Sequence, residues 1–288
     1  MKNVLAGAVG AAALLCLSPM AHAQEGCSVL TVLPVTISQP GKYCLAQNFT
    51  TAITSGTLIN IASNDVTLDC QKFTLRSTAT SNTGSSSAIV AMSRNNIVIE
   101  NCSIVGGFTY GINVSQVNSQ PTQSYYNTIR NNYVAGPYYQ GIIAFGSAIE
   151  VSDNRVYDVG GQLNQLAIGI RVGGSTTGGP KFQVIRHNGV IGTNSPASRA
   201  YGIYSDFSIG ALINENLITG TASAPGQVSY GVRISQGGGN TITGNNILDN
   251  GSGQSVGVST PASGGWCYDN LLRVGTNTQG CDATYGND

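Results

Sequence analysis

Asn127-Thr-Ile-Arg-Asn-Asn-Tyr-Val134 carries the short pattern that decides the fold of this chain. An apolar residue is followed by two mostly polar residues, an anchor that is usually Asn, one free position and a second apolar residue. Eight copies occur with 22 to 34 residues between anchors, and a repeat of this length with uneven insertions indicates a solenoid. The anchors are Gln71, Cys102, Asn132, Asn154, Asn188, Asn216, Asn245 and Asn270.

A glycine followed by Ile or Val lies between successive anchors and forms a second repeat. Apolar and polar residues alternate around these glycines, which predicts β-strands. No segment after residue 23 shows sustained helical periodicity. Two strand signals per repeat, in a constant order, predict an all-β protein that forms a parallel β-solenoid of about eight to nine coils. The glycine copies are Gly111-Ile112, Gly141-Ile142, Gly169-Ile170, Gly202-Ile203, Gly231-Val232 and Gly257-Val258.

The anchor asparagines can satisfy one another's hydrogen bonds inside such a stack. Asn tolerates the left-handed backbone conformation that a sharp bend between strands needs, and its side-chain amide both donates and accepts hydrogen bonds. Stacked amides can bond to the amides above and below, and each bond contributes roughly 0.5–1.5 kcal/mol net. We therefore predict a structural asparagine ladder formed by Asn132, Asn154, Asn188, Asn216, Asn245 and Asn270.

The first 23 residues have the features of a secretory signal peptide. Lys2 precedes an apolar run at 4–17, and Ala21-His22-Ala23 is an A-x-A cleavage motif. The run is too short for a transmembrane helix, so we expect cleavage after Ala23, a secreted or periplasmic protein, and no transmembrane segment in the mature chain. We expect one β-helix domain at 24–288. It consists of an N-terminal cap with the first coil at 24–65, repeat coils at 66–265 and a C-terminal cap at 266–288.

Six cysteines follow residue 23, and an even number in an exported chain favours disulfides. Six cysteines allow fifteen pairings. Cys70 and Cys102 stand one coil apart and one residue out of register, which places their Cα atoms roughly 6 Å apart and within disulfide reach. The alternative for all six is free buried thiols. The remaining cysteines can form two disulfides between residues close in sequence, Cys27–Cys44 near one end of the domain and Cys267–Cys281 near the other.

The charge of the chain is low and balanced. Charged residues make up 9% of the sequence, and 13 basic residues match 13 acidic ones. A nucleic-acid-binding protein needs a basic face that neutralises phosphates. The sequence has no such concentration of basic residues, so we expect no nucleic-acid partner.

The repeats resemble those of a known superfamily. The segments at 96–104, 127–134 and 240–247 are similar to parallel β-helix repeats of the pectin-lyase-like superfamily, and the opening, Gly41-Lys-Tyr-Cys-Leu45 through Asn64-Asp-Val-Thr-Leu-Asp69, resembles the entry to secreted right-handed β-helix proteins. The resemblance covers about residues 38 to 275 and implies a right-handed parallel β-helix. It implies no single activity, because the superfamily contains lyases, hydrolases, epimerases, phage tailspikes and proteins with no known activity. The aspartate cluster, Gly-His-Gly and Arg-x-Lys segments of its polygalacturonate hydrolases are absent from this sequence.

The outward positions of the glycine strands offer the best candidate for a ligand site. Two residues after successive glycines stand Arg171, Tyr204 and Arg233, which we expect about 5 Å apart in adjacent coils. Asp206 follows on the same face as Tyr204. We also expect each glycine to point outward, so that open backbone can accept a flat ligand. Arg pairs with carboxylate or sulfate in a bidentate manner, so these four residues predict a groove for an acidic glycan. The alternative is a solvated face with an Arg–Asp pair.

A bound metal ion has little support in the sequence. A calcium site needs six or more oxygens and usually clustered carboxylates, and Asp206 is the one carboxylate in the candidate groove. We therefore expect no cofactor, with calcium as a weak alternative. Asp153, His187 and Glu215 share a column across three coils, which we interpret as a structural or weak metal-binding column. Tyrosines at 125–126, 133 and 138–139 either bind saccharide or cover the edge of the core.

The sequence thus predicts an exported β-helix protein that binds carbohydrate or has a structural role at the cell surface, without efficient catalysis. The partner suggested by the arginines is an acidic polysaccharide. One alternative is a polysaccharide lyase or related polysaccharide-modifying enzyme that acts on an acidic glycan, with an unrecognised catalytic group among the four groove residues. A second alternative is an adhesin-like scaffold with no ligand groove.

Overall fold

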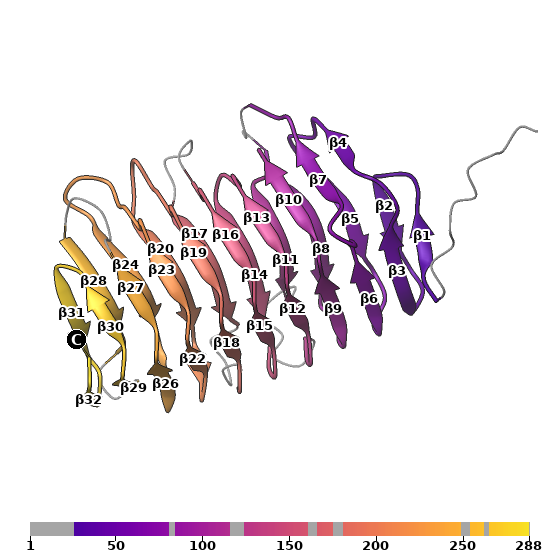
Figure 1. Ribbon diagram of the computed structural model, residues 1–288. Helices are drawn as coiled ribbons and strands as arrows, with labels where there is room; N and C mark the ends of the chain where they lie inside the picture. The colour runs from indigo at the N-terminus through magenta and orange to yellow at the C-terminus, as the bar shows by residue number, and fades with distance from the viewer. Residues whose placement is uncertain are drawn as a thin grey trace, which may run out of the picture.

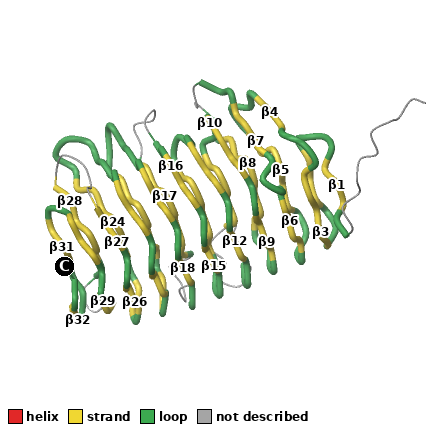
Figure 2. Tube along the Cα trace, in the orientation of Figure 1, coloured by secondary structure: helices red, strands yellow, loops and turns green. Residues whose placement is uncertain are grey.

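The computed structural model describes residues 26–80, 84–115, 124–160, 166–174, 181–248, 254–261 and 265–287. Coils of strand stack side by side from the N-terminal to the C-terminal end (Figure 1), and strands and loops make up the whole of these ranges (Figure 2). Within them there is no helix that is long and apolar enough to cross a membrane. The predicted signal peptide at 1–23 lies outside the described residues.

Three long parallel sheets, here called A, B and C, form the sides of the coils. Sheet A has 11 strands: β1 (Ser28–Leu30), β3 (Gly41–Leu45), β6 (Val66–Asp69), β9 (Ile97–Glu100), β12 (Thr128–Arg130), β15 (Glu150–Ser152), β18 (Val184–Arg186), β22 (Leu212–Asn214), β26 (Asn240–Thr243), β29 (Gly265–Tyr268) and β32 (Ala283–Tyr285). Sheet B has 10 strands: β2 (Val35–Ile37), β5 (Gly56–Ile61), β8 (Ser86–Met92), β11 (Tyr110–Ser115), β14 (Gln140–Phe145), β17 (Ala167–Gly173), β20 (Ala200–Asp206), β24 (Val228–Ile234), β28 (Gln254–Ser259) and β31 (Thr276–Gln279).

Sheet C has nine strands: β4 (Phe49–Thr51), β7 (Thr74–Ser77), β10 (Ser103–Gly106), β13 (Tyr133–Ala135), β16 (Arg155–Tyr157), β19 (Gly189–Ile191), β23 (Leu217–Thr219), β27 (Asn246–Leu248) and β30 (Leu271–Arg273). A short pair, β21 (Ser208–Ile209) and β25 (Gly237–Gly238), lies at a turn. Each strand of sheet C follows one of sheet A and precedes one of sheet B, so the described chain forms nine complete coils. The predicted all-β parallel solenoid of about eight to nine coils is confirmed.

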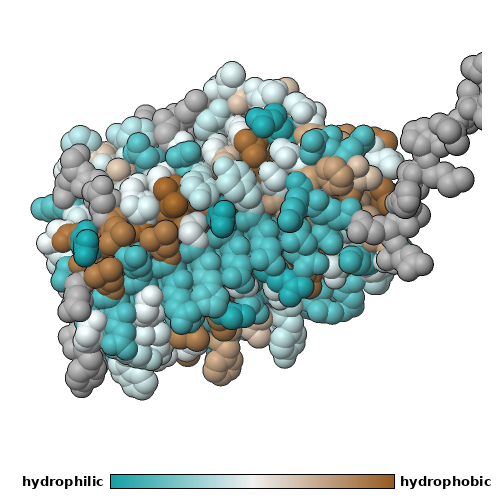
Figure 3. Space-filling view, in the orientation of Figure 1, coloured by the Kyte–Doolittle hydropathy of each residue, from teal (hydrophilic) through white to brown (hydrophobic). Residues whose placement is uncertain are grey.

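One continuous apolar core fills the interior of the coils. In sheet A, Leu68 pairs with Ile99, Ile99 with Ile129, and Ile129 with Val151, and all four side chains are fully buried. Each buried aliphatic side chain of this kind contributes roughly 1.5–3 kcal/mol. Figure 3 shows, on the face that it presents, a hydrophilic band over the middle coils, with hydrophobic side chains toward both the N-terminal and the C-terminal ends.

The anchor asparagines are buried at the corner between sheets A and C, and their amides form an unbroken chain of hydrogen bonds. Nδ2 of Asn154 donates to Oδ1 of Asn188 at 3.0 Å, and Nδ2 of Asn188 donates to Oδ1 of Asn216 at 3.0 Å. Each amide oxygen also accepts the backbone N–H of the preceding anchor, and each amide nitrogen also donates to a carbonyl in that preceding coil. The same bonds join Asn132, Asn154, Asn188, Asn216, Asn245, Asn270 and Asn287.

The left-handed backbone conformation does not fall on the ladder asparagines, contrary to our expectation. It falls on the residue before each of them, including Asn131, Asp153, His187 and Glu215, with φ between 54° and 63° over the whole set. The preceding residue makes the bend, and the ladder asparagine can therefore keep its side chain pointing into the interior. The role of the ladder asparagine is to satisfy buried backbone groups, and the bend is made one position earlier.

The two ends of the ladder differ from the sequence pattern. Asn287 continues the ladder although Thr284 stands three residues before it, where the other copies have an apolar residue or Cys267. At the other end Ile104 pairs with Leu75, so the predicted copy built on Gln71 and Phe73 is wrong. The first turn is longer, Gln71 and Lys72 both take the left-handed conformation, and Cys70 fills the interior position.

The disulfides join the cysteines in the three pairs that geometry and proximity favoured. Cys70–Cys102 links adjacent coils across a Cα separation of 4.6 Å, directly before the first asparagine of the ladder. Cys27–Cys44 and Cys267–Cys281 link the end coils to their neighbours, with Cα separations of 5.9 and 5.8 Å. All three thus close short loops at or near the ends of the stack.

The glycine column points into the core, so our expectation that it faces outward is wrong. A Cβ on Gly202 would collide with Cγ2 of Ile218 in sheet C and would lie 2.7 Å from the carbonyl oxygen of Gly231. Gly169 and Gly231 face sheet C in the same way, through Val190 and Ile247. Glycine is required here because sheets B and C approach too closely for a side chain. The following Ile or Val also points inward, so strict alternation breaks at every glycine.

Replacing a ladder asparagine should destabilise the fold strongly. In Asn188→Ala the backbone and side-chain N–H groups of Asn154 lose their shared acceptor inside the core. Each orphaned buried group costs about 1–3 kcal/mol, so we expect a loss of about 2–5 kcal/mol in unfolding free energy by urea titration. The matched control is Asn214→Ala in the next coil, because the amide oxygen of Asn214 has no hydrogen-bond partner. Equal losses in the two variants would contradict the ladder's role.

Substitution of a glycine in the inward column should be more harmful than substitution of a glycine at an open strand position. We expect Gly202→Ala to cost about 1–3 kcal/mol, because an overpacked core must shift to accept the methyl group. Gly189→Ala serves as control, since its Cβ would meet nothing within 4 Å and its φ lies outside the left-handed region. The control should be neutral or slightly stabilising. Thermal unfolding followed by circular dichroism measures both variants, and a neutral Gly202→Ala would contradict the close approach of the two sheets.

Candidate functional site

The outward side of sheet B, called here the B face, carries the residues predicted to bind a ligand. Strand pairing places Arg171 beside Tyr204 and Tyr204 beside Arg233, in the adjacent strands β17, β20 and β24. Asn113 and Ile143 precede them in the same column, and Ser259 follows. The arginine column is therefore continuous, as the register of the sequence repeats indicated. Neighbouring strands lie about 4.8 Å apart, so one extended ligand can contact several members.

A second outward column stands directly before the glycines. It includes Ile168, Tyr201, Tyr230 and Val256, which pack together as a hydrophobic cluster separate from the main core. The rings of Tyr201 and Tyr230 stack with centroids 5.4 Å apart and an interplanar angle of 7°. Since the glycines point inward, the B face is lined by these aromatic and aliphatic side chains where we expected open backbone.

Arg171 is held in a single orientation by its neighbours. Its Nη2 donates to Oδ2 of Asp206 at 2.9 Å. Its guanidinium lies over the ring of Phe145 at 5.0 Å and over that of Tyr204 at 5.6 Å. Its Nε is buried without a hydrogen-bond partner. Cation–π contacts and the ion pair together preorganise the cation, which lowers the entropy lost when it binds an anion.

Asp206 supports the face rather than presenting a free carboxylate. One oxygen accepts from Arg171, and the other accepts from the hydroxyl of Ser235 at 2.6 Å. The Arg–Asp pair that we considered as the alternative is thus present. A carboxylate already engaged through both oxygens is poorly suited to hold a hard cation, which needs several oxygen ligands. Asp206 therefore acts as a positioning residue for Arg171.

Arg233 is less constrained and lies beside an open pocket. Its guanidinium stacks over Tyr230 at 4.6 Å, and its Nη1 donates to the hydroxyl of Ser259 at 3.3 Å. In the described chain no carboxylate lies within 4.0 Å of it. The adjoining pocket has a volume of about 490 Å³ and is lined by Tyr230, Val256 and Gln279 among others. Pockets of this size are typical of small-ligand sites.

The phenol of Tyr201 stays neutral on this face. Burial raises its pKa above the ordinary value, and this effect outweighs the lowering caused by Arg199 and Arg233 nearby. The hydroxyl can therefore donate as well as accept a hydrogen bond at neutral pH. Two arginines and one internally paired carboxylate leave the centre of the B face net positive.

The three residues of the histidine column meet one another on a different corner, between sheets A and C. Nδ1 of His187 lies 3.6 Å from Oδ1 of Asp153, and Nε2 of His187 contacts Oε2 of Glu215. Both ring nitrogens therefore face carboxylates from adjacent coils. No group of three or more potential ligands with metal-binding geometry occurs among the described residues. The contacts fit a column of side chains that contact one another between coils, which is the structural part of our interpretation.

The sequence reasoning missed the aromatic column of Tyr201 and Tyr230 and the contribution of Phe145. These tyrosines precede glycines, and strict alternation would assign them to the interior. The signal that could have placed them is the pair Tyr-Gly at 201–202 and 230–231, because a tyrosine directly before an inward glycine must turn outward. Phe145 lies beyond the arginine column, and its contact with Arg171 depends on the side-chain rotamer.

Comparisons with known proteins report likeness in fold. Residues 163–287, less than half of the chain, match the family described as periplasmic copper-binding protein (NosD). No curated protein sequence matches the chain. Among similar solved structures, the alginate lyase from Paenibacillus sp. str. FPU-7 has a TM-score of 0.47 and 13% identity, covering 86% of this chain and 93% of the lyase.

Two further structures come from Azotobacter vinelandii. The A-module of mannuronan C-5 epimerase AlgE4 has a TM-score of 0.38 and 11% identity, covering 85% of this chain and 78% of the module. The A-module of AlgE6 has a TM-score of 0.37 and 13% identity, with coverage of 85% and 80%. At these identities the likeness carries no argument about activity. The chain is a parallel β-helix repeat protein, in agreement with its resemblance to the pectin-lyase-like superfamily, and its C-terminal part is similar to the NosD family.

Proposed function

We propose that this protein is an exported, non-catalytic β-helix that binds an acidic polysaccharide along its B face. The observation that carries the proposal is the column of Arg171, Tyr204 and Arg233 in three adjacent strands, flanked by stacked Tyr201 and Tyr230. A polysaccharide repeats along its length as the column does, so successive sugar units can meet successive coils.

Each member of the column has a distinct part in binding. The arginines bind carboxylate or sulfate groups through charged hydrogen bonds, which are stronger than neutral ones. The tyrosine rings supply flat apolar area for the faces of sugar rings, and their hydroxyls supply hydrogen bonds. The pocket beside Tyr230 and Gln279 can accept a bulkier unit or a chain end. Asp206 keeps Arg171 in place between Phe145 and Tyr204.

Export to the cell surface or the periplasm agrees with the chemistry of the chain. Three disulfides are typical of proteins that mature in an oxidising compartment. The predicted signal peptide, cleaved after Ala23, would direct the protein there, and the family matched by residues 163–287 is described as periplasmic. Secretion from the cell or retention in the periplasm are both compatible with the proposal.

Copper binding, named in the description of that family, does not fit the residues of this chain. Copper sites in proteins typically combine several imidazole, thiolate or thioether ligands. All six cysteines after residue 23 are in disulfides, so none offers a free thiolate. His187 is the one histidine after residue 23, and both of its ring nitrogens face carboxylates. The described residues include one methionine, Met92. Its sulfur accepts a hydrogen bond from the hydroxyl of Ser115, and it is far from His187 in the sequence. We therefore propose no role for copper.

Removal of both arginines should abolish specific binding to acidic glycans. We expect Arg171→Ala plus Arg233→Ala to weaken binding at least about tenfold on an array of pectate, alginate, glycosaminoglycan and neutral glucan oligosaccharides, equivalent to about 1.4 kcal/mol or more. The matched control is Arg130→Ala plus Arg186→Ala, which removes the same charge from the outward side of sheet A. Binding that survives the first double substitution, or falls equally with the control, would contradict a site on the B face.

The alternative, a polysaccharide lyase, makes a different prediction. A lyase creates unsaturated sugar ends that absorb ultraviolet light, and its base must approach a sugar proton directly. Arg171 is paired with Asp206, and both oxygens of Asp206 are engaged, so neither group is placed as a free base. We expect no new absorbance when the purified protein is incubated with pectate, alginate or glycosaminoglycans. Product formation that disappears in Tyr204→Phe would establish the lyase instead, and absence of both binding and products would favour the scaffold.

A further inference from the structure

A polar groove runs over the outside of the asparagine ladder, on the corner between sheets A and C. It crosses the turns that lead into β10, β13 and β16 and has a volume of about 640 Å³. Ligand sites commonly fall in this range of volume. None of its lining residues belongs to sheet B, so the groove is separate from the B face.

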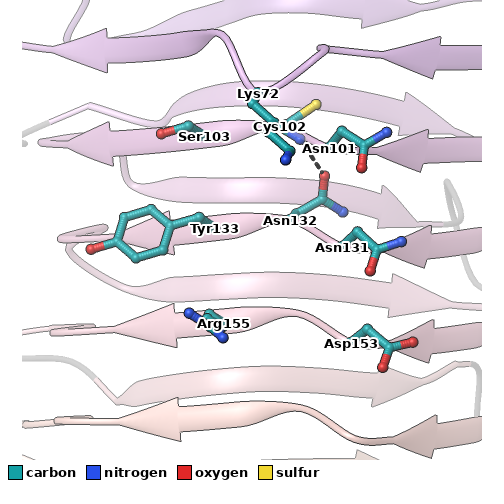
Figure 4. A pocket seen from close by; sticks show the side chains of 9 residues that line it. All are labelled: Lys72, Asn101, Cys102, Ser103, Asn131, Asn132, Tyr133, Asp153 and Arg155. Carbon is teal, nitrogen blue, oxygen red and sulfur yellow. Dashed lines mark hydrogen bonds between the residues drawn. The ribbon is translucent and has the colours of Figure 1, made fainter.

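The groove is a consequence of the ladder pattern. The ladder residue points inward, and the residues on either side of it turn outward and diverge. Figure 4 shows one wall formed by Asn101, Asn131 and Asp153, and the facing wall formed by Ser103, Tyr133 and Arg155. The buried amide of Asn132 lies on the floor between them. Strand pairing holds the second wall in register, with Tyr133 beside both Ser103 and Arg155.

Tyr133 offers an open aromatic surface within this groove. Its side chain is 41% exposed, and Figure 4 shows its ring nearly face-on to a viewer who looks onto the groove. Tyr157 in the next coil contacts it at a centroid distance of 5.4 Å and fixes its orientation. Tyr138 behaves differently, because it is 9% exposed and its hydroxyl donates to the carbonyl of Ala79. Tyr138 covers the edge of the core, whereas Tyr133 is available to a ligand.

The two ends of the groove carry cations without carboxylate partners. Lys72 and Arg155 have no carboxylate within 4.0 Å in the described part of the chain. Neighbouring cations on sheet A are all paired: Lys42 with Asp69, Arg130 with Glu100 and Arg186 with Glu150. The one acidic group of the groove, Asp153, turns toward His187 in the next coil. The groove is therefore lined by two cations and one carboxylate, and an anionic ligand would complement its net positive charge.

We propose that this groove is a second binding site, which takes a short anionic oligosaccharide. The ring of Tyr133 packs against the apolar face of one sugar, and Arg155 bonds the carboxylate or sulfate of the next. Lys72 attracts a further anionic group, and the exposed amide of Asn131 bonds ring hydroxyls. Lys72 and Arg155 are three coils apart, about 14 Å at the strand spacing, so the ligand spans more than one sugar unit.

The second site does not depend on the B-face proposal, because it uses other residues on another side of the coils. Two sites on different sides would let one molecule hold two polysaccharide chains, or two stretches of the same chain. Simultaneous occupation raises the overall avidity without new contacts. The same protein would then act as a cross-link in a surface polysaccharide layer.

Calorimetric titration of the full mature chain with defined hexasaccharides tests this proposal. The probes are an oligogalacturonate, a sulfated glycosaminoglycan fragment and a neutral maltohexaose. We expect a charged probe to bind at two sites per chain, and Tyr133→Ala plus Arg155→Gln to leave one site while weakening the other by about tenfold or more. Tyr133→Phe alone should keep both sites, because the ring remains. The neutral hexasaccharide should bind the groove much more weakly than at least one charged probe.

The matched control is Tyr126→Ala plus Arg130→Gln, which changes the same residue types in the same coil outside the groove. It should bind like the unchanged protein, and circular dichroism should show the native fold for all variants. Unchanged stoichiometry and affinity in the groove variant, or equal losses in groove and control variants, would overturn the second site. Loss of binding only in Arg171→Ala plus Arg233→Ala would also overturn the second site, and it would support the site on the B face. The two proposals can therefore fail separately.

Discussion

Parallel hydrogen bonding between successive coils is the constraint on which the rest of this structure depends. It places equivalent residues of adjacent coils about 4.8 Å apart, whatever the length of the loops between them. The amides of Asn154, Asn188 and Asn216 can bond in a chain because this spacing suits an amide donor and the next amide acceptor. The same spacing stacks Tyr201 on Tyr230 outside the coils. One backbone distance thus organises the interior and the surface.

The interior also determines which residues reach the surface. At the corner between sheets A and C, an inward asparagine leaves its two neighbours pointing outward and apart, and a groove forms over it. In sheet B, Gly202 and Ile203 both point inward, so Tyr201 and Tyr204 come to the same outer face although they are three residues apart. The B face and the corner groove are therefore two results of the same need to fill a narrow interior. Loops can vary in length without disturbing either, because both are built from strands and tight turns.

The sequence predicted columns well and side-chain direction less well. Register follows from counting between repeats, so Arg171, Tyr204 and Arg233 were placed together, as were Asp153, His187 and Glu215. Direction was inferred from alternation, which fails where two consecutive residues turn inward at each glycine. Asparagine favours the left-handed conformation, so the sequence pattern predicts the bend at the ladder asparagine. In the structure the bend lies one residue earlier, because the ladder asparagine must point inward to form its hydrogen bonds. The sequence pattern does not reveal Asn287, because Thr284 replaces the apolar residue that precedes the other ladder asparagines, whereas the hydrogen bond from Asn270 includes it in the ladder.

A stack of equal coils presents its side chains in columns. Each column supplies one side chain for each coil, which matches the repeated units of a polymer. The binding energy is then a sum of modest contacts, so a single substitution removes a small share and paired substitutions are needed to expose the site. Preorganised residues such as Arg171, held by Asp206 and two aromatic rings, make each contact more effective because less freedom is lost on binding.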